Sequence, residues 1–144
     1  SDGSGNIYNS IDFITIATLG NAQDFGDVTV NRQTKAAASN STRGIFAGGK
    51  VSPSSTGTII DYITISTRGN TMDFGDLSVA TDHANTGASS PVRMLISGGG
   101  TGPNAGLNTI QYITIATQGD SVDFGDRTND QRRATGISNA NGGL

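Results

Sequence analysis

The chain has 144 residues, of which 33% are hydrophobic and 15% are charged, and its net charge is −3. A negative chain argues against a nucleic-acid partner, because such partners bind basic surfaces. The sequence contains no apolar run long enough for a transmembrane helix, no signal peptide and no cysteine, so we expect neither membrane insertion nor disulfides. Its 21 glycines and short apolar runs favour an all-β fold rich in turns.

A 17-residue segment occurs three times and organises the sequence. The copies span residues 11–27, 60–76 and 110–126, reading IDFITIATLGNAQDFGD, IDYITISTRGNTMDFGD and IQYITIATQGDSVDFGD. Copies one and two share 12 residues, copies two and three share 11, and the spacings are 49 and 50 residues. A fixed period of this size indicates a repeat architecture. We therefore expect residues 1–144 to form a single domain of repeats, either trimmed or excerpted from a longer chain, because residue 1 is not Met.

The first repeat, taken in chain order, predicts a loop and then a strand over residues 11–18. Apolar or small groups alternate onto both faces of this strand, so we expect it to be covered on both sides. Gly20-Asn21 predicts a turn. The DFGD motif at residues 24–27 leads into a β-prone run at residues 28–30.

The remaining chain continues this pattern with two further kinds of strand. A run of small residues is followed by an apolar run that ends in glycines, and a polar loop then leads to the next copy. The small-residue runs are at 36–39, 86–89 and 134–138, and the apolar runs are at 44–47 and 94–97.

Each full period thus predicts four short strands, which is the size of one β-propeller blade. The small-residue strand suits the crowded axis of a propeller, and the aromatic residues lie on the third and fourth strands, where blades diverge. A β-solenoid or fibre-like β-helix is the alternative, although a rung of fifty residues would be long. About three repeats are too few to close a ring, so we expect a partial propeller, or one completed by oligomerisation, with a two-chain six-bladed ring as the natural version.

The repeats resemble kelch repeats at several positions. Gly48-Gly49 and Gly98-Gly99 match the kelch diglycine, and Tyr62 and Tyr112 match the kelch tyrosine, with Phe13 in the first copy. Phe25, Phe74 and Phe124 stand where kelch repeats have tryptophan, a residue that this chain lacks. The resemblance implies a kelch-like β-propeller used for binding or structure, and it implies no catalytic residues and no cofactor.

The amino-acid sequence of the repeats is also similar to that of repeats in structural proteins from marine bacteriophages, cyanophages among them. This resemblance implies a virion or extracellular location, with other virion proteins or further copies of the chain as partners. A glycan or protein of the host surface is a further candidate partner, contacted through the variable links at residues 50–57 and 101–108. A cellular lectin-like propeller that binds carbohydrate or protein is the alternative.

The DFGD motifs place Asp24, Asp73 and Asp123 at equivalent positions, each followed three residues later by Asp27, Asp76 or Asp126. Carboxylates could hold a hard cation, but repetition in every copy favours a structural role, in which Asp caps a tight turn and Gly supplies a positive φ. An enzyme such as a glycosidase would need two carboxylates aimed at one pocket. We therefore expect no metal site and no catalytic activity.

Other candidate residues also have structural explanations. The glycine runs lack the Gly-Lys-Ser/Thr and the helix of a phosphate loop. His83 is the only histidine and is expected to be exposed in a link. The link arginines could bind an anionic ligand, but we expect them to pair with Asp27, Asp76 or Asp126 between blades; these are Arg32, Arg43, Arg93, Arg132 and Arg133.

Overall fold

The computed structural model describes residues 7–33, 35–51, 55–83, 85–101, 105–132 and 136–138. These residues form an all-β structure without a helix, so none of them belongs to a helix that could cross a membrane. The strands are β1 (Ser10–Phe13), β2 (Gln23–Asp27), β3 (Arg32–Gln33), β4 (Ala36–Ser39), β5 (Arg43–Ala47), β6 (Lys50–Val51), β7 (Ser55–Thr64), β8 (Met72–Thr81), β9 (Asn85–Ser89), β10 (Arg93–Ser97), β11 (Leu107–Thr114) and β12 (Val122–Gln131).

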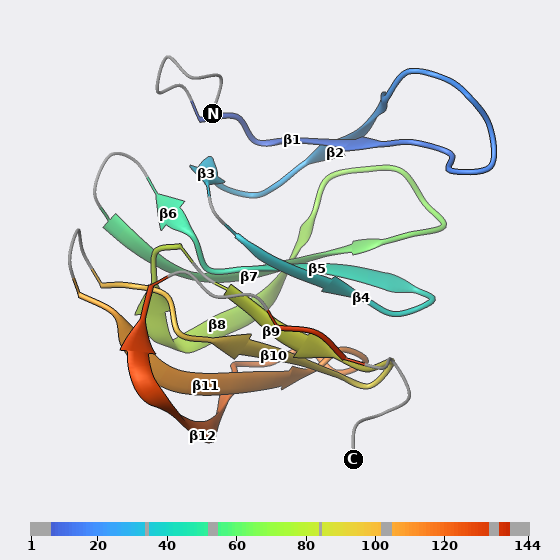
Figure 1. Ribbon diagram of the computed structural model, residues 1–144. Helices are drawn as coiled ribbons and strands as arrows, with labels where there is room; N and C mark the ends of the chain where they lie inside the picture. Colours follow the sequence, from blue (N-terminus) through green and yellow to red (C-terminus); the bar gives the residue numbers. More distant parts are fainter. Residues whose placement is uncertain are drawn as a thin grey trace.

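Two four-stranded antiparallel units follow one another along the chain. Strands pair in the order β4-β5-β7-β8 in the first unit and β9-β10-β11-β12 in the second. The predicted order of a small-residue strand, an apolar strand, an ITI strand and a DFGD strand is confirmed in both. The hairpin β1-β2 is the corresponding pair of the first copy, and the short strands β3 and β6 join it to the next unit. The three parts are stacked in chain order (Figure 1).

The core lies between the stacked units. The apolar strands and the ITI strands supply its fully buried side chains, because both kinds of strand are central in a four-stranded unit and are covered by the next one. The buried side chains are Ile45, Ile60, Met94, Ile96, Ile113 and Ile115.

Each copy also contains an aromatic pair that joins its ITI strand to its DFGD strand. The rings meet edge to face at centroid distances of 6.1, 6.0 and 6.1 Å in copies one, two and three, an arrangement that aromatic quadrupoles favour. The pairs are Phe13–Phe25, Tyr62–Phe74 and Tyr112–Phe124.

The prediction of a strand over residues 11–18 is wrong for the first copy, because β1 ends at Phe13. In copies two and three the ITI segment pairs with an apolar strand on its other side, β5 or β10. No described strand takes that place beside β1. Ile14 and Ile16 are consequently 62% and 94% exposed, and the expected cover on both sides is absent there.

The DFGD strand of the first copy is also shorter than predicted. β2 ends at Asp27, so the β-prone run at residues 28–30 forms no strand, whereas β8 and β12 continue well beyond the same motif. β8 and β12 pair there with the first halves of β7 and β11, and β1 has no such first half. Residues 136–138 of the third small-residue run form no strand either, and residues 134 and 135 lie outside the described residues.

The turn that closes each hairpin lies earlier than Gly20-Asn21. Backbone N–H groups of Thr18, Thr67 and Thr117 donate to the carbonyls three residues before them, at 3.2, 3.1 and 3.1 Å. The Gly-Asn segment follows the turn, so the hydrogen bond of the turn does not use its backbone groups.

Candidate functional site

The loops that follow the second and third ITI strands dock on the DFGD strand of the preceding copy. We call residues Gly69–Thr71 and Gly119–Ser121, with their counterpart Gly20–Ala22, the docking loops. We call Phe25–Thr29, Phe74–Ser78 and Phe124–Thr128 the acceptor edges. A docking loop on an acceptor edge forms a junction, and the described residues contain two junctions.

The first junction is made by four hydrogen bonds. Two backbone N–H groups of the docking loop donate to the acceptor edge, and two backbone N–H groups of the edge donate to side chains of the loop. The bonds are Gly69 N to Phe25 O (2.9 Å), Thr71 N to Asp27 O (2.8 Å), Asp27 N to Asn70 Oδ1 (3.0 Å) and Thr29 N to Thr71 Oγ1 (3.0 Å).

The second junction repeats the same four bonds with the equivalent atoms. They are Gly119 N to Phe74 O (2.8 Å), Ser121 N to Asp76 O (2.8 Å), Asp76 N to Asp120 Oδ1 (3.0 Å) and Ser78 N to Ser121 Oγ (2.8 Å). Asn is exchanged for Asp and Thr for Ser, and each exchange keeps the required acceptor oxygen. The pattern Gly-Asn/Asp-Thr/Ser is therefore a recognition element.

The glycine of the DFGD motif allows this close approach. Gly26 and Gly75 have φ angles of 150° and 146° and lie at β-bulges, a conformation that glycine adopts at little cost. A Cβ atom there would lie 2.3 Å from Gly69 O and 2.5 Å from Gly119 O. The motif supplies a bulge and a docking surface inside a strand, and the expected tight turn is not present.

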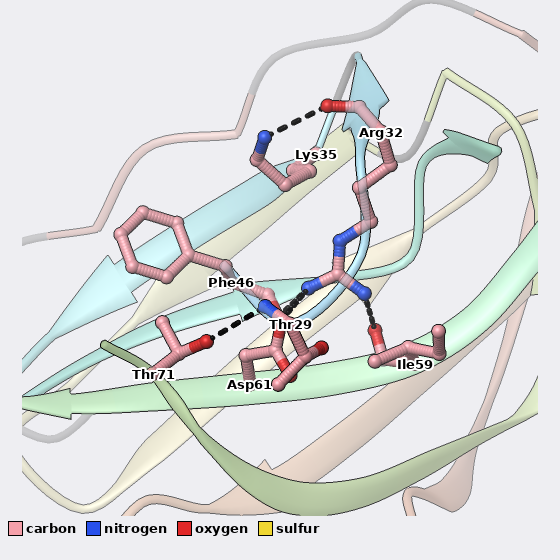
Figure 2. A network of polar contacts seen from close by, with 7 residues as sticks. All are labelled: Thr29, Arg32, Lys35, Phe46, Ile59, Asp61 and Thr71. Atoms are coloured by element: carbon pink, nitrogen blue, oxygen red, sulfur yellow. Dashed lines mark hydrogen bonds and ion pairs between the residues drawn. The ribbon is translucent and has the colours of Figure 1, made fainter. Parts of the chain in front are cut away.

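A buried ion pair fills the first junction (Figure 2). Arg32 Nη2 lies 2.7 Å from Asp61 Oδ2, and both side chains are fully buried. The guanidinium also donates to the carbonyls of Ile59 (2.8 Å) and Phe46 (3.2 Å), and Thr29 Oγ1 donates to the other carboxylate oxygen of Asp61 (2.8 Å). This network joins the link after copy one to the ITI strand of copy two.

Burial changes the acid–base properties of the two cations here. Desolvation lowers the pKa of Arg32, and the neighbouring Asp61 opposes this effect. The pKa of Lys35 is lowered by desolvation and then by the charge of Arg32. Lys35 Nζ donates to the backbone oxygen of Arg32 at 2.9 Å, which holds the two cations close together.

The second junction replaces the ion pair by neutral groups. Gln111 stands in the place of Asp61 and Thr81 in that of Arg32, and both are buried. Gln111 Oε1 accepts hydrogen bonds from Ser78 Oγ (2.9 Å) and Ser121 Oγ (2.7 Å), and its Nε2 donates to Val79 O (3.1 Å). One structural position thus accommodates either a charged or a neutral hydrogen-bonded network.

The predicted pairing of the link arginines with the DFGD aspartates is wrong. Arg32 pairs with Asp61 on the ITI strand, and Arg132 lies 3.4 Å from Asp82. Arg43 and Arg93 stack on the rings of Tyr62 and Tyr112, each at 4.7 Å from the centroid. The guanidinium groups of Arg43 and Arg93 thus contact an aromatic ring on the neighbouring strand in place of a solvated DFGD carboxylate. Arg133 lies outside the described residues.

The aspartates at the start of the DFGD motifs, Asp24, Asp73 and Asp123, are exposed. Among the later ones Asp76 has a structural role, because its Oδ1 accepts a hydrogen bond from Thr58 Oγ1 at 2.8 Å. In the described parts of the chain no three His, Cys, Asp or Glu residues gather as metal ligands would.

The diglycines and His83 lie where consecutive repeats approach one another. Gly49 and Gly99 have φ angles of 102° and 99° and donate to the last carbonyls of β8 and β12, those of Thr81 (3.0 Å) and Gln131 (3.3 Å). His83 is partly buried, contrary to prediction, with Nδ1 3.3 Å from Asp82 Oδ1. The links at residues 50–57 and 101–108 are described only in part, because residues 52–54 and 102–104 lie outside the described residues.

Two hollows occupy equivalent places beside the aromatic residue of the ITI strand. The one in copy one has a volume of about 80 Å³ and is lined by Phe13, Thr15 and Asn21 among others. The one in copy three has a volume of about 270 Å³ and is lined by Tyr112, Thr114 and Asp120 among others. Both combine an aromatic ring with hydroxyl and amide or carboxylate groups.

Sequence reasoning missed the docking loops and the buried ion pair. The loop signal is visible in retrospect as the conserved glycine followed by Asn or Asp and then Thr or Ser in copies two and three. The ion pair has no such signal, because Asp61 is replaced by Gln111 in the next copy. In comparisons with known proteins, no family model and no curated protein matches the chain.

Proposed function

We propose that the chain is a non-enzymatic, kelch-like β-propeller module that serves as a structural and binding element of a phage virion, in a tail, a fibre or a capsid decoration, with loops that contact the host surface. The observation that carries the structural part is the repeated junction. The same four hydrogen bonds hold the second and the third ITI–DFGD unit to the previous one. A repeated junction of this kind lets four-stranded units be added one after another, as the blades of a propeller are.

The roles of the polar residues support a module without catalysis. Asp61 neutralises Arg32, and the backbone of Asp27 and Asp76 holds the docking loops. The bonds to the backbone of Asp27 and Asp76 recur at both junctions, which is typical of architecture, whereas a catalytic site is normally built once. The virion assignment depends on the similarity of the repeat sequence to that of phage structural proteins.

The experiment that tests the virion assignment is peptide mass spectrometry of purified virus particles from the source of the sequence. Peptides of the chain should co-purify with intact particles through a density gradient. Their presence only in the soluble fraction of infected or uninfected cells would contradict the assignment.

The two equivalent hollows, in copies one and three, favour the second candidate, a lectin-like propeller that binds carbohydrate. Sugars bind proteins by placing a ring face on an aromatic side chain while polar groups bond the hydroxyls. Phe13 and Tyr112 have such polar neighbours, and Arg68 and Arg93 lie over one face of these rings, at 4.6 and 4.7 Å from the centroids, so a sugar would use the other face. A glycan array followed by NMR titration tests it. Saturable shifts near both Phe13 and Tyr112 would support this function, and silence across the array would exclude it.

A further inference from the structure

The acceptor edge of the third copy carries no docking loop among the described residues. Phe124 is 54% exposed, whereas its counterparts Phe25 and Phe74 are 9% and 3% exposed. A Cβ atom on Gly125 would meet open space, although a Cβ atom on Gly26 or Gly75 would collide with a docked loop. Gly125 nevertheless keeps the bulged conformation, with a φ of 137°. The edge is therefore formed, and none of the described residues covers it.

The opposite end of the described chain has the complementary feature, a docking loop without an edge. Gly20 and Asn21 correspond to Gly69 and Asn70 of the first junction, although Gly20 lacks the positive φ of the docked Gly69 and Gly119 (149° and 150°) and would have to adopt it on docking. The neighbouring Leu19 and Ile16 are fully or almost fully exposed, at 105% and 94%. Large apolar side chains exposed together mark a contact surface.

We propose that these two ends bind each other between copies of the chain. The docking loop Gly20–Ala22 of a second copy would lie on the acceptor edge Phe124–Thr128 of the first. The two internal junctions specify the contacts: Gly20 N donates to Phe124 O, Ala22 N donates to Asp126 O, and Asp126 N donates to Asn21 Oδ1. The contact is heterologous, so it produces either a closed ring or an open chain of copies.

A polar residue at the first end has a defined partner at the internal junctions. Asp12 is the counterpart of Asp61 and Gln111, which both face the acceptor edge of the previous copy, through Thr29 and Ser78. Asp12 is exposed and would face the edge of the neighbouring molecule. That edge carries Thr128, the counterpart of Thr29, whose Oγ1 donates to Asp61 at the first junction.

One of the four junction bonds would be missing between copies. Thr71 Oγ1 and Ser121 Oγ accept the N–H groups of Thr29 and Ser78 at 3.0 and 2.8 Å. The third loop residue is Ala22 in the first copy, and its side chain has no oxygen that could accept a hydrogen bond from the backbone N–H of Thr128. The contact between molecules should therefore be weaker than an internal junction, and restoring the hydroxyl should strengthen it.

Sedimentation equilibrium of the full chain over a range of concentrations tests the proposal. The wild-type chain should self-associate reversibly. Ala22→Thr should tighten the association roughly five- to tenfold, as one added hydrogen bond allows, and Asn21→Ala should weaken it by a similar factor. All three positions of the loop are exposed, so these variants should leave folding intact.

Ala17→Ser is the matched control, because copy two has Ser at this position in the turn before the docking loop, and it should leave the association unchanged. A wild-type chain and an Ala22→Thr variant that both stay monomeric at millimolar concentration would overturn the proposal. Association that none of the loop variants alters would also overturn it, since the interface would then lie elsewhere.

Discussion

Arg32 and Asp61 form an ion pair with a distance of 2.7 Å, although neither side chain has any exposed surface. The pair bridges two repeats, and its neutral counterpart, Thr81 and Gln111, occupies the same place in the next junction. A buried charge without its partner is costly, whereas replacing both partners by well-packed neutral groups can be nearly neutral. The neutral residues of the second junction therefore show which substitutions can test how much the ion pair contributes to stability.

Arg32→Thr alone should lower the free energy of unfolding by about 3–5 kcal/mol, because Asp61 would remain buried and unpaired. Arg32→Thr combined with Asp61→Gln reproduces the neutral junction and should recover at least about half of this loss. Chemical denaturation of the two single variants and the double variant measures the coupling. The control is Arg68→Thr, which removes an exposed arginine stacked on Phe13 and should cost at most about 1 kcal/mol. Additive single effects would show that the pair is not coupled.

The strand order of each repeat can be predicted from the sequence because its signals are local. Apolar runs, glycine pairs and the repeated ITI and DFGD segments each identify one strand, and the fixed period sets their sequence. The first copy departs from the prediction because strand length depends on pairing: Ile14 and Ile16 have the same residue types as Ile113 and Ile115, but no described strand pairs with them.

The candidate site was harder to predict because it is built between repeats. Asp61 and Gln111 differ in charge, so an alignment of the copies marks the position as variable, and only the folded chain shows that both bond the preceding acceptor edge. The glycine of DFGD indicates an unusual backbone, yet the reason for it lies in Gly69 and Gly119 of the next repeat.

Gly75→Ala should destabilise the chain more than Gly125→Ala. Both residues have positive φ, so alanine at either position brings backbone strain of roughly 1–3 kcal/mol. Only at residue 75 does the new Cβ also collide with a docked loop, at 2.5 Å from Gly119 O. Thermal or denaturant unfolding of dilute samples, where association between molecules is negligible, gives the comparison. Equal losses would mean that the second junction adds nothing to stability.

Lys35→Met should change how stability depends on alkaline pH. The pKa of Lys35 is lowered in the folded chain by desolvation and by Arg32, so the unfolded chain binds more protons between that lowered pKa and the ordinary value of 10.5. The burial cost of the charged amine is present below this window and is relieved as pH rises through it. The wild-type chain should therefore gain unfolding free energy relative to Lys35→Met as pH rises toward 10.5. Parallel pH profiles of the two proteins would contradict this assignment.

Amide hydrogen exchange by NMR on a dilute sample tests the central claim, that the DFGD strand of one repeat is the acceptor for the loop of the next. The amides of Gly69, Thr71, Gly119 and Ser121 donate across the two junctions and should exchange slowly, because opening them requires separation of the repeats. Their counterparts Gly20 and Ala22 make no such bond to any described residue and should exchange at rates near those of an unstructured peptide. Equally fast exchange at all these positions would show that the loops are not docked and would contradict the account.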